Sequence, residues 1–222
     1  TNGIGLSAGT IAFGSTLDGH IGVTFSGTQS ITGTGEIVCA DSTLGYSRAF
    51  APSAGATLTL GPGVTMRGAV AQIGTTTGNI VNQGTMRSEA AGRTISITNC
   101  ASSGLIEAVN GSTTTIGGAW SNSGTLSETA STLNLAGTFA FGGLGAVVRS
   151  GGTIHLTGIL TIASGQTLDF NATTGSWLLV GGTVIGGTLS GVGGAGLVTN
   201  FNGTLSGVTI AGTGLSIPSG TN

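Results

Sequence analysis

The sequence predicts an all-β protein, a parallel β-solenoid with about 20 residues per coil. Gly84, Gly104 and Gly124 stand 20 residues apart in three copies of one short motif, which begins with Asn or Ser two positions before each glycine. Short runs that alternate polar and apolar residues recur between glycine turns. The chain of 222 residues has 45 Gly and 5% charged residues, and Thr, Ser, Val and Ile replace the usual helix formers. These features favour strands and tight turns over helices.

Composition also limits the function classes. A mean hydropathy of +0.43 with net charge −2 is atypical of a disordered chain. No run approaches the roughly 18 apolar residues of a membrane helix, so we expect no transmembrane segment. Five scattered Arg and no Lys cannot form the basic stripe of a nucleic-acid binder, so we expect no nucleic-acid partner.

Residues 1–50 are the least periodic part, although short strands are still predicted in 9–13, 22–25 and 27–31. We expect irregular N-terminal coils or a cap here, because a solenoid must cover its end. Residues 51–222 are predicted to be the regular part of the same elongated domain. The closing residues 217–222 resemble the start of another repeat, so we expect the natural chain to continue.

The regular part carries a four-residue motif that begins with Thr. The motif recurs at 57–60, 94–97, 113–116, 132–135, 153–156 and 167–170. Side chains alternate faces along a strand, so its second and fourth residues should point inward and stack from coil to coil. Leu133 and Leu135 should therefore share a column with Ile95 and Ile97, and Thr114 is the one polar residue expected inside. A glycine turn precedes most copies, as at Gly55, Gly92, Gly111 and Gly165, where positive φ is needed.

The two cysteines, Cys39 and Cys100, lie close to three periods apart. Coils that rise about 4.8 Å each would separate them by roughly 14 Å, beyond the ~7 Å between Cα atoms that a disulfide tolerates. We expect two free thiols. No signal peptide heads the chain, so Thr1 is expected to follow processing or a fragment boundary.

Several segments, including 27–38, 58–68, 122–126 and 205–210, resemble the repeats of large bacterial surface and secreted proteins. These are the autotransporter-passenger or haemagglutinin-like β-strand repeat proteins. The resemblance implies that the β-helix is right-handed and that the protein is secreted or exposed at the cell surface.

One functional alternative is a polysaccharide-degrading β-helix enzyme. Such an enzyme would need clustered carboxylates for acid/base chemistry or Ca²⁺. The seven acids (Asp18, Glu36, Asp41, Glu89, Glu107, Glu128 and Asp169) are spread along the chain, and Glu107 is expected to pair with Arg87 one coil below. His20 and His155 are far apart, and His155 falls in an outward position. No motif for a metal, a cofactor or a nucleophile is present, so we expect no catalytic residues.

A second alternative is an ice-binding solenoid, because Thr hydroxyls in register can order water. The candidate binding residues form one expected outward ladder: Thr57, Thr94, Thr113, Thr132, Thr153 and Thr167. The row beside it keeps Thr only at Thr59 and Thr115. Thr is also common on the exposed face of any strand.

The favoured hypothesis is a structural or adhesive module that forms a rod, stalk or filament. It requires no active site. Expected partners are further copies joined end to end, neighbouring repeats of the same protein, or a carbohydrate or host-surface ligand.

Overall fold

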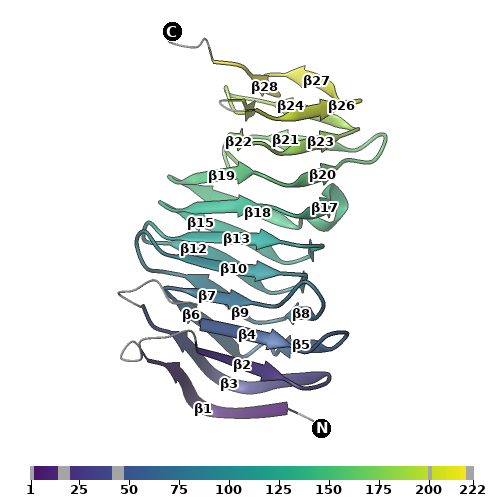
Figure 1. The fold of residues 1–222 in the computed structure, drawn as a ribbon. Helices are drawn as coiled ribbons and strands as arrows, with labels where there is room; N and C mark the ends of the chain where they lie inside the picture. Colours follow the sequence, from purple (N-terminus) through teal and green to yellow (C-terminus); the bar gives the residue numbers. More distant parts are fainter. Residues whose placement is uncertain (1–2, 15–20, 42–47, 200–201, 219–222) are drawn as a thin grey trace.

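The computed structural model describes residues 3–14, 21–41, 48–199 and 202–218, and within these ranges the chain is a β-solenoid with roughly 21 residues per turn. All strand pairs are parallel. In Figure 1 the strands on the near side run from left to right as the chain climbs, and the chain returns behind them, so the coil is right-handed. The predicted fold class is confirmed.

Each regular coil contributes one strand to each of three faces. Face one is a single ten-stranded sheet. Its strands are β2 (Ile21–Phe25), β4 (Arg48–Pro52), β7 (Ala71–Ile73), β10 (Thr94–Thr98), β13 (Thr113–Gly117), β16 (Thr132–Leu135), β19 (Thr153–Leu156), β22 (Trp177–Leu179), β25 (Leu197–Val198) and β28 (Leu215–Ser216).

Face two follows face one along the chain. It consists of β5 (Thr57–Leu60), β8 (Asn79–Asn82), β11 (Cys100–Ser102), β14 (Ser121–Asn122), β17 (Thr138–Ala140), β20 (Ile159–Thr161), β23 (Thr183–Ile185) and β26 (Thr204–Ser206). A parallel bridge from Ala119 to Thr138 joins its lower and upper parts. A 3₁₀ turn, η1 (Phe141–Gly143), forms the next corner above β14.

Face three completes each coil. It consists of β6 (Val64–Gly68), β9 (Thr85–Ser88), β12 (Leu105–Val109), β15 (Thr125–Thr129), β18 (Ala146–Ser150), β21 (Thr167–Phe170), β24 (Thr188–Gly191) and β27 (Thr209–Gly212). Its sheet is interrupted, since β18 pairs only with β15 and β21 only with β24.

The N-terminal coils stack on the same column. The long strand β3 (Gln29–Cys39) pairs with β5 through its first part and with β6 through its last part, so it bends around the corner between faces two and three. Strand β1 (Gly3–Phe13) pairs along almost all of β3. The described residues within 1–50, a range expected to form irregular coils or a cap, thus contribute paired strands to the solenoid.

One apolar column fills the interior. Leu133 lies over Thr114 and Ile95, and Leu135 lies over Ile116 and Ile97, as predicted. These five aliphatic side chains are at most 1% exposed, and burying each contributes about 1.5–3 kcal/mol. Aromatic rings extend the column, for example the stacked pair Trp120 and Phe139 with centroids 4.2 Å apart.

Several inward polar residues are hydrogen-bonded. Thr114, the predicted exception, is buried, and its hydroxyl donates to the carbonyl oxygen of Glu107 at 3.2 Å. At the corner between faces two and three, buried Asn82 donates to Ser102 Oγ at 3.1 Å and to Leu105 O at 3.2 Å. Asn122 repeats the arrangement two coils up, donating to Leu144 O at 3.0 Å. The Asn or Ser of the repeated motif therefore supports a corner of the coil.

Candidate functional site

The outward Thr residues are divided among the faces. Thr94, Thr113, Thr132 and Thr153 are register partners on β10, β13, β16 and β19, and they form one row on face one. Thr57 lies on β5 of face two and Thr167 on β21 of face three. The prediction of one six-member ladder is therefore wrong for these two residues. Every face carries the same alternating motif, so sequence alone could not separate the faces.

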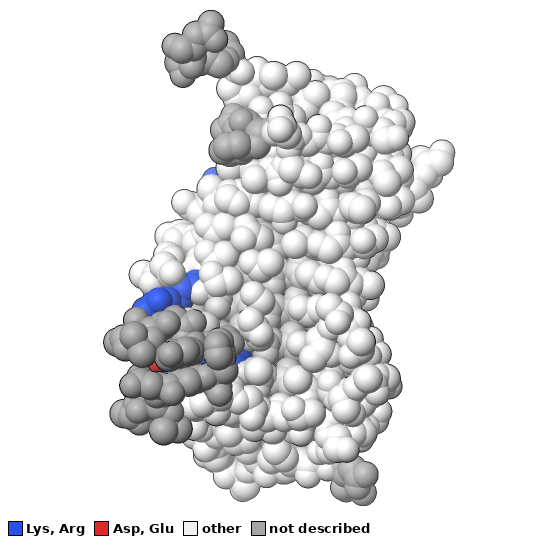
Figure 2. All heavy atoms as spheres, in the orientation of Figure 1, with Lys and Arg blue, Asp and Glu red and all other residues white. Residues whose placement is uncertain are grey.

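The neighbouring outward row on face one is mixed. It consists of Ser96, Thr115, Asn134 and His155. Asn134 Nδ2 donates to Thr115 Oγ1 at 3.2 Å, and the hydroxyls of Thr132 and Thr153 lie 3.3 Å apart. Several polar groups thus bond to one another. Figure 2 shows the near side of the molecule uncharged over most of its area, with arginine visible at one edge.

Face two carries a shallow trough. Two adjoining depressions of about 390 and 410 Å³ share Val81, Ala101 and Ser121, which are register partners on the outside of β8, β11 and β14. Thr57 and Asn79 line the lower end, and Gly142 and Gly143 of η1 line the upper end. No charged residue lines either depression. At about 4.8 Å per coil, the trough extends roughly 19 Å along the solenoid and offers hydroxyl, amide and small apolar groups.

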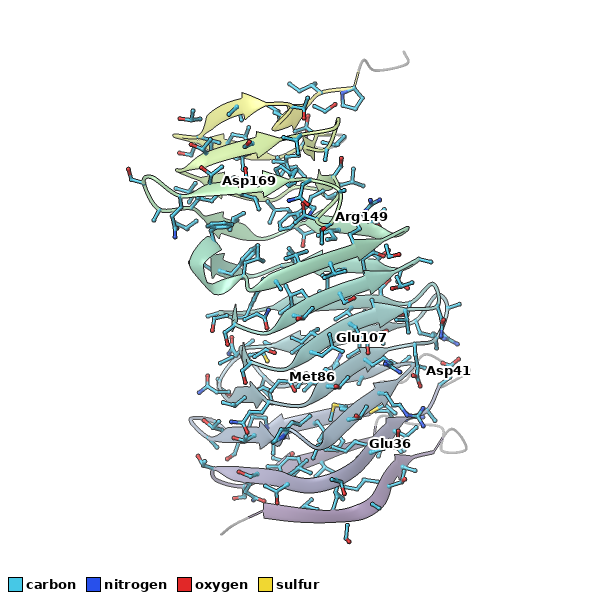
Figure 3. The ribbon with its side chains drawn as sticks, turned by 180° about the vertical axis from the view of Figure 1, so that it is seen from behind. Glu36, Asp41, Met86, Glu107, Arg149 and Asp169 are labelled. Atoms are coloured by element: carbon cyan, nitrogen blue, oxygen red, sulfur yellow. The ribbon has the colours of Figure 1, made fainter. Side chains whose placement is uncertain are left out.

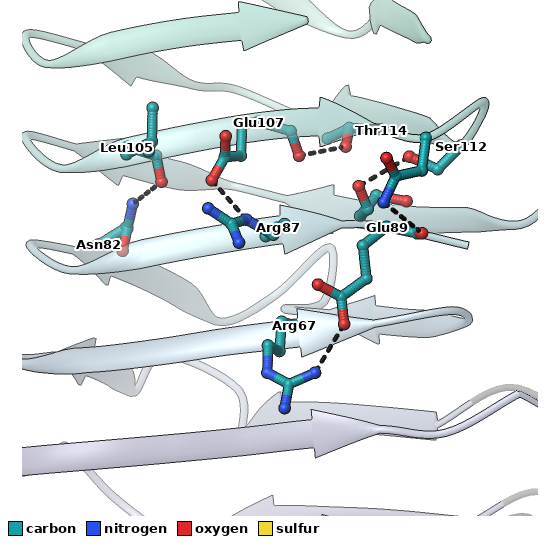
Figure 4. A network of polar contacts seen from close by, with 10 residues as sticks. Arg67, Asn82, Arg87, Glu89, Leu105, Glu107, Ser112 and Thr114 are labelled. Carbon is teal, nitrogen blue, oxygen red and sulfur yellow. Dashed lines mark hydrogen bonds and ion pairs between the residues drawn. The ribbon is translucent and has the colours of Figure 1, made fainter. Parts of the chain in front are cut away.

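Face three carries an ionic cluster of five residues: Glu36, Arg67, Arg87, Glu89 and Glu107 (Figures 3 and 4). Arg67 and Arg87 are register partners, so two like charges stack directly. Arg67 Nη1 binds Glu89 at 2.7 Å and its Nη2 binds Glu36 at 2.9 Å, while Arg87 Nε binds Glu107 at 2.6 Å.

These contacts confirm the predicted pair of Arg87 and Glu107, although the Glu107 side chain is only 11% exposed. The hydrogen bond from Arg67 lowers the pKa of Glu36, and the two glutamates raise the pKa of Arg67. Sequence spacing revealed one of the three ion pairs. The other two pairs join residues whose separations in the sequence do not match the 20-residue period, so the period does not predict them.

The other described acids are separate from this cluster. Asp41 binds Arg93 at 2.8 Å. Glu128 is fully buried and accepts backbone N–H bonds from Ser150 and Gly152, both at 3.1 Å. Asp169 is exposed on β21. Asp18 and His20 lie outside the described residues. Within the described ranges, no three His, Cys, Asp or Glu residues gather in a metal-binding arrangement.

The fold determines the environments of His155 and the two cysteines. His155 occupies the predicted outward position on β19 and is half-buried, and this burial lowers its pKa. Cys39 and Cys100 are free, as expected, and both are buried. Burial raises the pKa of Cys39 to about 11 and that of Cys100 to about 12, so both are unreactive thiols at neutral pH.

The fold and its surfaces define a class of protein: a right-handed parallel β-solenoid with a row of hydroxyls, an uncharged trough and an ionic cluster on its three faces. No protein-family model, curated protein or solved structure matches the chain. Among the described residues, no helix is long and apolar enough to cross a membrane.

Proposed function

We propose that the chain is a structural and adhesive module of a large secreted or surface-exposed bacterial protein, and that it works without catalysis. Location and family follow from the sequence resemblance to autotransporter-passenger and haemagglutinin-like repeats. The trough on face two is the observation that supports adhesion. Its lining is uncharged and hydroxyl-rich, and its roughly 19 Å length suits several units of a neutral glycan chain.

The geometry also indicates how a glycan would be held. Outward Ser121 and Asn79 offer side-chain hydrogen bonds, and Val81 and Ala101 give a flat apolar floor for the carbon face of a sugar ring. The walls are corner segments, including Asn99, whose side-chain oxygen is already fixed by the N–H of Ala119 at 2.9 Å. A site that is rigid before binding loses little conformational entropy on binding.

The test is binding of neutral and acidic polysaccharides to the purified chain and to Ser121→Arg, which places a long charged side chain in the trough. Ser127→Arg is the matched control, because Ser127 is the outward residue of β15 on face three. We expect neutral glycans to bind the wild type and Ser127→Arg, and Ser121→Arg to lose at least about ten-fold in affinity. Equal binding by all three proteins would contradict the trough as the site, and shortening of any glycan would favour the enzyme alternative.

The four-residue Thr row on face one supports a second candidate, ice binding. Among the residues that the structure describes, this face keeps one Thr-x-Thr pair, at Thr113 and Thr115, because Thr57 and Thr59 lie on face two. Thermal hysteresis of the wild type that disappears in Thr132→Lys would establish this function. We expect no hysteresis, since the row beside the four Thr residues contains Asn134 and His155, and the face offers no flat double rank of hydroxyls.

A further inference from the structure

The interruption of face three leaves two strand edges facing each other. Along a parallel strand, alternate residues direct their backbone N–H and C=O to opposite neighbours. Ala146 donates downward to Gly124 O, so the next residue, Val147, directs its backbone groups upward, toward β21. Thr188 on β24 donates to Gln166 O, so Thr167 directs its groups downward, toward β18. The described residues show no strand pairing between β18 and β21.

A cavity of about 190 Å³ lies at this interruption. Its floor consists of four buried apolar residues from both sides of the break: Leu144, Val147, Leu168 and Trp177. Thr167 and Asp169 of β21 stand at its mouth. An apolar cavity of about 150 Å³ is known to be large enough to bind benzene. The cavity therefore has room for one six-membered ring with a short substituent.

The mouth of the cavity carries a negative charge. Asp169 is exposed, and none of the ion pairs found among the described residues includes it. The nearest arginine along face three, Arg149, directs its Nε toward buried Glu128, at 3.7 Å. Figure 3 shows Arg149 and Asp169 on successive coils of this side of the solenoid.

We propose that this cavity binds a small primary ammonium ion that carries an apolar ring. The ring occupies the floor between Leu168 and Val147. The ammonium group, which has three N–H donors, bonds the Asp169 carboxylate and the open backbone carbonyl groups at the strand edges. An anion of the same size would meet the like charge of Asp169, and a neutral alcohol would lose the ion pair. The proposal is independent of the trough on face two.

Calorimetric titration with benzylammonium chloride tests the proposal. Benzyl alcohol and benzoate, which carry the same aromatic ring, are the comparison ligands. We expect benzylammonium to bind more tightly than benzyl alcohol, and benzoate to bind least. Asp169→Asn should weaken benzylammonium binding about 2–5-fold, which is the range of an exposed ion pair, and leave benzyl alcohol unchanged. Glu36→Gln removes the same charge from the ionic cluster and should have no effect.

A second pair of variants tests the location. Thr167→Trp fills the mouth with a ring that strands tolerate and should reduce binding of benzylammonium at least ten-fold. Thr188→Trp, at the register partner one coil above, should bind like the wild type. The proposal is overturned if Thr167→Trp, shown by circular dichroism to be folded, still binds normally, if benzoate binds as well as benzylammonium, or if the wild type binds no probe.

Discussion

At the scale of single residues, the interior depends on a few polar side chains, most of whose partners lie on the neighbouring coil. The clearest is Glu128, whose carboxylate is fully buried and accepts backbone N–H bonds from Ser131, Ser150 and Gly152. A buried carboxylate is tolerated only when such donors replace water. Through these bonds, the Glu128 side chain joins the corner after β15 to the corner one coil above.

We predict that Glu128→Ala lowers the free energy of unfolding by about 3 kcal/mol, because three backbone donors lose their acceptor and Arg149 loses its ion-pair partner. Urea unfolding followed by circular dichroism measures this loss. Glu36→Ala removes a carboxylate from an exposed ion pair and should hardly change the urea concentration at the midpoint of unfolding. Similar midpoints for the two variants would contradict a structural role for Glu128.

His155 gives a prediction about pH. Burial lowers its pKa in the folded protein, so as the pH falls through about 6.5 the unfolded chain takes up the proton first. The stability from this site is present above that pH and is lost below it. The melting temperature of the wild type should therefore fall more between pH 7.5 and 5.5 than that of His155→Asn, which carries the residue found one coil below. Parallel falls would show that burial of His155 has no thermodynamic effect.

Residue roles were predictable where they follow from alternation and not where they depend on contacts between coils. The inward place of Thr114 and the outward place of His155 follow from the side-chain period of two. The burial of Glu128 does not, because acidic residues are mostly exposed and its donors come from 131, 150 and 152.

At the scale of the coil, the regular glycines mark places where two coils approach closely. Gly84, Gly104 and Gly124 stack at one corner, and a Cβ on Gly104 would collide with the backbone oxygen of Gly84. This differs from the turn glycines at Gly92 or Gly111, which do adopt the predicted positive φ. The 20-residue period was evident in the sequence, but its physical cause, backbone contact between coils, required the structure.

We predict that Gly104→Ala destabilises the protein by about 1–3 kcal/mol, the typical result of overpacking. Gly117→Ala is the matched control, since a Cβ at Gly117 in β13 meets nothing within 4 Å. The control should unfold at the wild-type denaturant concentration or slightly above it. Equal destabilisation by both substitutions would indicate a loss of backbone freedom instead of a collision.

At the scale of the whole molecule, the apolar column reaches the last strand described on face three. Ile210 continues the inward column of Leu168 and Leu189, yet it is 41% exposed because, among the described strands, β27 pairs only with β24. Exposed strand edges above an apolar layer favour pairing with a further coil. Another copy or a neighbouring repeat of the same protein would supply such a coil.

We predict that the wild-type chain associates with rising concentration in sedimentation velocity and that Ile210→Lys reduces this association. Ile159→Lys is the matched control, because Ile159 is also 41% exposed but lies on the side of the solenoid, on β20. A monomeric wild type, or equal association of both variants, would contradict end-to-end assembly.

The overall architecture was predictable because one repeated motif specifies strand, turn and inward pair together. The assignment of coils to three faces was not, since Thr57, Thr94 and Thr167 begin equivalent motifs on three different sheets. The break between β18 and β21 was equally hidden, because β21 keeps the same alternating motif as the paired strands.

That break has a mechanical consequence. Most neighbouring coils are joined by strand ladders on all three faces, whereas face three lacks a ladder between β18 and β21. Under tension along its axis, we expect the molecule to part first at this level. Single-molecule stretching should then show an early, low-force step in which the residues on one side of the break unfold while the remaining coils stay folded.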